Sequence, residues 1–155
     1  MQFVDSRLFD AAPADVWAVI SDFDRYAEVA PNLSRVDVLD GDGVGMHRAC
    51  TDTDGRTWTE TCTAWEPERR YAVEVHVAES PFHRRLFHTF SGEWAMEPRD
   101  EGVLVTMTFG FLPRYGPLGR LVGRLLEREA RRLTAPIFDG WARELDVSPR
   151  PLPTD

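Results

Sequence analysis

The last third of the chain carries one long apolar stripe with helical spacing. From Pro117 to about Val147, apolar residues recur at steps of three and four, which is the spacing of one helical face. They are Leu118, Leu121, Val122, Leu125, Leu126, Leu133, Ile137, Trp141 and Leu145. At 1.5 Å per residue this helix reaches about 45 Å, far longer than an average helix.

The chain before this helix alternates polar and apolar residues, which is typical of half-buried strands. The alternation and the turn residues between the runs predict seven strands, at about 2–10, 34–40, 45–52, 56–66, 69–78, 86–97 and 102–112. Two short helices, Ala14–Ser21 and Asp22–Val29, are expected after the first strand. A long helix lying against a broad curved sheet can enclose space, so the pattern predicts a binding cavity.

Size and charge exclude several classes of protein. The 155 residues fit one domain that buries about 70% of its unfolded surface. A net charge of −8 argues against nucleic acid or an anionic membrane as partner. We expect a single domain over residues 1–147, present as a monomer or a homodimer. A disordered tail is expected over 148–155, which holds three prolines.

The chain shows no targeting or cross-linking pattern. It has no run of about 20 apolar residues, so no transmembrane segment is expected. Its first residues lack the basic start and apolar core of a signal peptide, which predicts a cytoplasmic protein. Two cysteines are too few for a disulfide scaffold. The four histidines form no metal-ligand motif, and we expect neither a metal nor a cofactor.

The Asp54-Gly55 pair predicts a tight hairpin. In the strand after it, threonines alternate with Trp58, Glu60 and Cys62, and we expect this second row to face the interior. A two-residue loop would pair His47 with Cys62.

That register would place His47 diagonally from Glu60 on the inner face and turn Cys50 outward, so both cysteines would be free thiols. A loop with an odd number of residues would break this pairing.

Two stretches resemble a known family. Phe9-Asp10-Ala11-Ala12-Pro13-Ala14-Asp15-Val16-Trp17 with Ser21-Asp22-Phe23-Asp24-Arg25-Tyr26 resembles the opening of START-like, helix-grip (SRPBCC) proteins. Phe111-Leu112-Pro113-Arg114-Tyr115-Gly116-Pro117-Leu118-Gly119-Arg120 looks like bacterial members before their final helix. The closer match is to the polyketide cyclase/dehydrase and lipid-transport branch.

The resemblance implies an α+β fold in which a seven-stranded curved antiparallel sheet grips the C-terminal helix. Two small helices close one end of a deep apolar cavity, and family ligands include polyketides, lipids, sterols and quinones. In aromatase/cyclase members a hydroxyl residue and an arginine lie on the strand that here holds Cys62 and Ala64. This chain has neither the hydroxyl residue nor the arginine at these two positions, which counts against a cyclase that uses this arginine.

Two carboxylates are the candidate polar groups of the cavity. Glu60 on the inner row has the character of a proton donor or a ligand anchor, although a plain cross-strand ion pair is the alternative. Glu129 lies on the apolar helix face between Leu125 and Leu133, so it either meets the cavity or lies where the helix is bent or exposed. Glu60, His47 and Cys62 together superficially suggest acid/base or thiol chemistry, without the geometry that this requires.

Strand alternation predicts the rest of the lining. His88 is separated from Phe90 and Trp94 by even numbers of residues, so it is expected on the same face of the strand as they are. It would be either a lone polar contact in the cavity or a structural histidine. The predicted ligand-binding set is His47, Trp58, Glu60, Cys62, His88, Phe90, Trp94, Met107, Phe109, Leu125, Glu129 and Leu133. The sequence therefore predicts that a hydrophobic small molecule binds between sheet and helix. The alternative is a polyketide aromatase/cyclase-dehydratase that uses Glu60 or Glu129 for acid/base catalysis.

Overall fold

The computed structural model describes residues 1–114 and 116–151, and the side chains of 1–114 and 130–151. The helices are α1 (Pro13–Ile20), α2 (Tyr26–Val29), α3 (His83–Leu86) and α4 (Gly116–Glu144). The strands are β1 (Gln2–Phe9), β2 (Leu33–Asp40), β3 (His47–Asp52), β4 (Thr57–Glu66), β5 (Arg70–Val75), β6 (Phe87–Arg99), β7 (Gly102–Pro113) and β8 (Arg150–Pro151).

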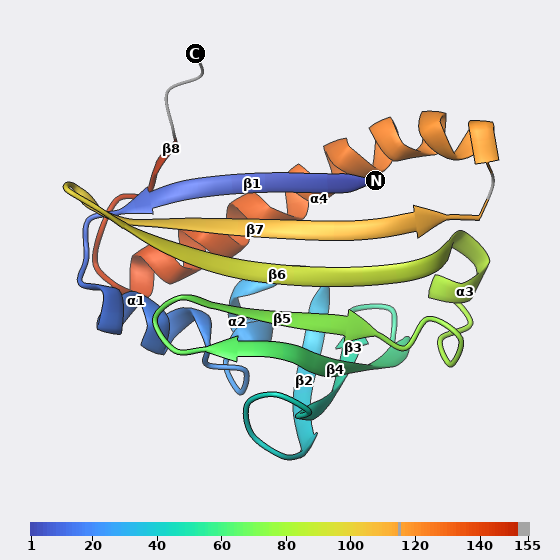
Figure 1. Cartoon of the computed structure of the whole chain (residues 1–155), viewed down its shortest axis with the longest axis horizontal. Coiled ribbons are helices and arrows are strands. Elements are labelled where there is room, and N and C mark those ends of the chain that lie inside the picture. Colours follow the sequence, from blue (N-terminus) through green and yellow to red (C-terminus); the bar gives the residue numbers. More distant parts are fainter. Residues whose placement is uncertain (115, 152–155) are drawn as a thin grey trace.

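The strands form one antiparallel sheet in the order β2-β3-β4-β5-β6-β7-β1-β8. The sheet curves beside α4, with α1 near one end of the long strands and α3 near the other (Figure 1). This confirms the predicted α+β helix-grip fold, its long terminal helix and the two short helices after the first strand. Arg150 and Pro151, within the segment expected to be disordered, pair with β1, whereas residues 152–155 lie outside the described part.

The C-terminal half of α4 anchors the helix to the core. Phe138 and Trp141 are almost completely buried, and the Trp141 ring lies 6.2 Å from the ring of Tyr26 on α2. A Cβ at Gly140 would lie 2.5 Å from Cγ1 of Val29, so only glycine permits this approach of α2 and α4. The C-terminal half of α4 is therefore packed closely against α2.

A buried polar contact also connects α4 to β1. Thr134, which is fully buried, donates a hydrogen bond to Oδ2 of Asp5 at 2.6 Å. Arg7 forms an ion pair with the other oxygen of this carboxylate at 2.6 Å. Because both oxygens of Asp5 have partners, the buried charge is compensated and fixes the position of the helix. Within the described part of the chain, no helix has the length and apolar character needed to cross a membrane.

The predicted register of the β3–β4 hairpin is wrong by one residue. Thr51 pairs with Thr57, and the loop between Asp52 and Arg56 therefore has three residues. The Asp52 carboxylate accepts hydrogen bonds from the backbone N–H groups of Asp54 and Arg56, and Gly55 takes a positive φ of 81°. This is the three-residue hairpin in which a glycine adopts the left-handed conformation.

Successive side chains of a strand point to opposite faces of the sheet, so the one-residue shift moves every side chain of β3 to the face opposite the predicted one. Arg48 and Cys50 now point inward, and His47 points outward. On the outer face, Thr61 Oγ1 lies 3.1 Å from Nε2 of His47 and 2.7 Å from Nε2 of His76. Cys50 and Cys62 are both buried and free, so the predicted free thiols are confirmed while the outward position of Cys50 is wrong.

Candidate functional site

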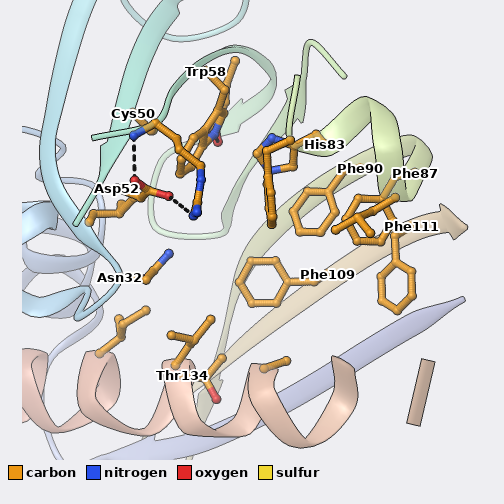
Figure 2. A pocket seen from close by; sticks show the side chains of 18 of the residues that line it. Asn32, Cys50, Asp52, Trp58, His83, Phe87, Phe90, Phe109, Phe111 and Thr134 are labelled. Carbon is orange, nitrogen blue, oxygen red and sulfur yellow. Dashed lines mark hydrogen bonds and ion pairs between the residues drawn. The ribbon is translucent and has the colours of Figure 1, made fainter. Parts of the chain in front are cut away.

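A cavity of about 450 Å³ lies between the inner face of the sheet and α4. Its described lining is dominated by aromatic side chains, from Phe3, Tyr26, Trp58, Phe82, Phe87, Phe90, Trp94, Phe109 and Phe111. The four phenylalanines from Phe87 to Phe111 gather near His83, while Thr134 reaches up from the helix (Figure 2). Ala130, Leu133 and Ile137 supply more of the helix side. The cavity has the size of a typical small-molecule site.

The principal polar group of the cavity is a buried ion pair. Arg48 on β3 lies opposite Glu60 on β4, and its Nε and Nη2 lie 2.8 and 2.7 Å from Oε2 of Glu60. Trp58 donates a hydrogen bond from its indole nitrogen to Oε1 of Glu60 at 2.8 Å. Arg48 and Glu60 are 2% and 6% exposed, so both charges are desolvated and must compensate each other.

Aromatic rings surround the Arg48 guanidinium. Its Cζ lies 4.6 Å from the ring centre of Phe23 and 5.8 and 5.9 Å from those of Tyr26 and Trp94. Burial is the largest single influence on the pKa of Arg48 and lowers it, but the charge and hydrogen bond of Glu60, with smaller effects of Cys50 and Tyr71, together raise this pKa, so Arg48 remains a cation. Its Nη1 is buried and has no hydrogen-bond partner among the described side chains. Contact with the ring faces supplies part of the missing stabilisation.

His83 on α3 is the second polar group and is 7% exposed. Its ring lies 5.0 Å from that of Trp58 and 5.7 Å from that of Phe90, and its Nδ1 is 2.8 Å from Oγ of Ser80. Burial lowers the pKa of His83, although the carboxylates of Glu60 and Asp52 act in the opposite direction. The imidazole is therefore neutral at pH 7.

We expect His83 to make folding stability fall on acidification. Because its folded-state pKa is below the ordinary value of 6.5, the unfolded chain binds a proton first as the pH drops. The contribution of the neutral His83 to the free energy of unfolding is complete above about pH 6.5 and is lost as the pH falls toward the lowered pKa. Urea denaturation of the unchanged protein and His83→Phe at about pH 7.5 and 5.5 should show a smaller acid loss in the variant. His88→Gln, at an exposed histidine, is the matched control, and equal acid losses in all three proteins would contradict the expectation.

The structure brings together half of the predicted ligand-binding residues. Those that line the cavity are Trp58, Glu60, Phe90, Trp94, Phe109 and Leu133. Cys62 and Met107 are instead buried in the hydrophobic core and are not among the lining residues. The side chains of Leu125 and Glu129 lie outside the described part, so both stay predictions.

The two predicted histidines do not line the cavity. His47 is exposed on the outer face because of the hairpin register, which also separates it from Glu60 and Cys62. His88 is exposed because the pairing of β6 with β7 is irregular between Phe87 and Thr89, which breaks the simple alternation. The predicted ligand-binding set does not include Arg48 or His83, although the proline- and aromatic-containing loop Glu79-Ser80-Pro81-Phe82-His83 is a plausible mouth of the cavity from its sequence. The odd loop length would have revealed Arg48, whereas nothing in the local pattern marks the four-residue helix that carries His83.

Comparisons of the chain with known protein families and solved structures agree with this architecture. The family model described as polyketide cyclase / dehydrase and lipid transport matches residues 1–144. The Zhui aromatase/cyclase from Streptomyces sp. R1128 superposes with a TM-score of 0.75 at 18% identity, over 94% of this chain and 93% of that one. A protein from Thermus thermophilus gives 0.73 at 17% identity, over 94% and 97%. Ara h 8.0201 gives 0.70 at 16% identity, over 92% and 98%. A comparison with curated protein sequences found no match.

Proposed function

The chain belongs to the polyketide cyclase/dehydrase and lipid-transport family, and from this membership we propose that it binds a hydrophobic small molecule between its sheet and α4. The observation that carries the proposal is the aromatic lining of a 450 Å³ cavity, together with the buried ion pair of Arg48 and Glu60. Transfer of apolar ligand surface from water contributes about 25 cal/mol per Å². A flat aromatic or polycyclic body suits rings such as Phe90 and Phe109, which favour offset or edge contacts.

The charge of the cavity favours an uncharged ligand. Arg48 and Glu60 neutralise each other at 2.7 Å, and Arg56 is paired with the carboxylates of Asp52 and Asp54. No net positive charge therefore remains among the described lining residues to compensate a ligand carboxylate. A carboxylate moved from water into an aromatic cavity without a counter-charge pays a large desolvation cost. We therefore expect neutral ligands, with carbonyl or hydroxyl oxygens, to bind better than free acids of the same shape.

Filling the cavity should weaken this binding strongly without unfolding the protein. Ala130 is half-buried on the helix side of the lining, so Ala130→Trp places an indole in the ligand space. We expect the affinity for the neutral fluorescent probe N-phenyl-1-naphthylamine to fall by about tenfold or more, which corresponds to about 1.4 kcal/mol. Fluorescence titration measures this change. Native mass spectrometry after gentle purification would detect a co-purified ligand.

Ala14→Trp is the matched control, because Ala14 is exposed on α1 and does not line the cavity. It should bind the probe like the unchanged protein. Equal probe affinity for Ala130→Trp and Ala14→Trp would show that the probe binds elsewhere and would refute the proposal.

A second candidate function is an aromatase/cyclase-dehydratase, which Arg48 favours. The resemblance placed the cyclase arginine near Ala64, where this chain has none, but Arg48 supplies a guanidinium to the cavity from the neighbouring strand β3. Although Glu60 compensates the charge, Nη1 of Arg48 has no partner among the described residues and could donate a hydrogen bond to a ketone, which would strengthen as the enolate forms during aldol closure. Incubation with a poly-β-ketone should then give cyclised aromatic products above the spontaneous background. A product distribution equal to that background would remove this candidate.

A further inference from the structure

The hydrogen bonds of Ser80 determine which nitrogen of His83 carries the proton. Ser80 is 3% exposed, and its Oγ has two neighbours: Nδ1 of His83 at 2.8 Å and the backbone N–H of His83 at 3.4 Å. The backbone N–H is a donor, so it uses a lone pair of Oγ. Within the described part of the chain, Nδ1 is the one acceptor bonded to this hydroxyl, and a buried hydroxyl proton without an acceptor is costly. Ser80 therefore donates to Nδ1.

This assignment places the ring proton of His83 on Nε2. A neutral imidazole that accepts at Nδ1 carries its hydrogen on the other nitrogen and donates from there. Protonation would require Nδ1 to donate to Ser80 and would leave the serine proton without a partner. The hydrogen bond thus acts in the same direction as burial and keeps the ring neutral.

Among the residues whose side chains the structure describes, none forms a hydrogen bond with Nε2, and His83 lines the cavity. The described ring neighbours there are aromatic, since Trp58, Phe87 and Phe90 lie 5.0, 6.5 and 5.7 Å from it between ring centres. Trp58 cannot accept the hydrogen, because its indole nitrogen is itself a donor and already bonds Glu60. An N–H donor among aromatic rings gains most from a ligand atom that accepts it.

We infer that His83 is a specificity-determining hydrogen-bond donor, whose Nε2–H binds an uncharged oxygen of the ligand at the aromatic end of the cavity. Ser80 is its positioning residue, since it does not line this cavity and acts by fixing the tautomer. The inference rests on the proposed function, because it requires that the cavity holds a ligand. It adds the class of group that meets this end: a ketone, quinone or ether oxygen.

The tautomer can be measured without any ligand. Two-dimensional ¹⁵N–¹H correlation spectra of the imidazole rings at neutral pH distinguish Nε2–H, Nδ1–H and the imidazolium, and His83→Phe identifies the resonances of His83. We expect pure Nε2–H in the unchanged protein and a mixture with Nδ1–H in Ser80→Ala, because alanine removes the donor to Nδ1. A dominant Nδ1–H tautomer or an imidazolium in the unchanged protein would overturn the inference.

Ligand recognition is tested with two probes of nearly equal shape, 2-acetylnaphthalene and 2-isopropenylnaphthalene. The acetyl oxygen accepts a hydrogen bond, and the isopropenyl carbon does not. The ratio of their dissociation constants cancels differences in apolar burial. We expect His83→Phe, which keeps an aromatic ring, to shift this ratio against the ketone by about threefold to tenfold, the worth of one neutral hydrogen bond. His88→Gln should leave the ratio unchanged, because His88 is exposed outside the cavity.

The outcomes separate this inference from the proposed function. An unchanged ratio in a His83→Phe protein that still binds both probes would overturn the ligand contact alone. If neither probe bound the unchanged protein, the proposed function and the ligand contact would both fail, while the spectra would still decide the tautomer. Should His83→Phe not fold, Ser80→Ala provides the second variant, and a smaller shift in the same direction supports the inference.

Discussion

Arg48→Met is expected to destabilise the protein by about 3–5 kcal/mol, because it leaves the Glu60 carboxylate buried without its cation. Glu60 is 6% exposed, and the indole of Trp58, a neutral donor, would remain bonded to it without supplying a compensating charge. The substitution also removes the cation from its contact with Phe23, 4.6 Å away. Urea denaturation at neutral pH measures the change in the free energy of unfolding.

Two controls identify the cause of this loss. The double variant Arg48→Met/Glu60→Leu removes both charges and should recover most of the stability, since apolar residues of similar volume often replace a buried pair without loss. Arg35→Met breaks the exposed ion pair with Asp37 and should cost less than about 1 kcal/mol. A double variant as unstable as Arg48→Met would show that packing, and not the unpaired charge, explains the effect.

Trp141→Ala is expected to cost about 3–5 kcal/mol, the range for removing a large side chain from a core. Trp141 is 1% exposed and packs between Phe138 on α4 and Tyr26 on α2, with ring centres 5.8 and 6.2 Å away. Because Tyr26 also lines the cavity, we expect probe affinity to fall as well, where the variant remains folded. Thermal denaturation and the N-phenyl-1-naphthylamine titration measure the two effects.

Asp139→Ala is the control for this variant, because Asp139 is exposed on the same turn of α4. Its stability should stay within about 0.5 kcal/mol of the unchanged protein. A loss below about 1 kcal/mol for Trp141→Ala would mean that the C-terminal half of α4 does not anchor the helix to the core.

Periodicity predicted the elements well because burial acts on every residue of a long segment. The apolar stripe from Pro117 to about Val147 corresponds to α4, which spans Gly116–Glu144, and each of the seven predicted strands has its counterpart from β1 to β7. Two short elements, α3 and β8, were not predicted. Four and two residues are too few to show a period, and their conformation depends on the chain around them.

The identity of the residues that line the cavity depends on local details of turns and strand pairing, which the periodicity of the sequence does not show. The Asp52 carboxylate closes a three-residue loop through the N–H groups of Asp54 and Arg56, and this brings Arg48, instead of His47, opposite Glu60. The irregular pairing after Phe87 likewise turns His88 away from the cavity. One residue of register exchanges every side chain between the two faces of a strand, so a small error in a turn changes the composition of a site completely.

The order of polar and apolar residues was therefore enough to specify a long helix, seven strands and the inward position of Glu60, since the hydrophobic effect acts on the pattern alone. The partners of Glu60 were decided only in three dimensions. Arg48, Trp58 and the rings around the guanidinium meet through hydrogen bonds and contacts over a few ångströms, which depend on register, loop length and the packing of α2 and α4.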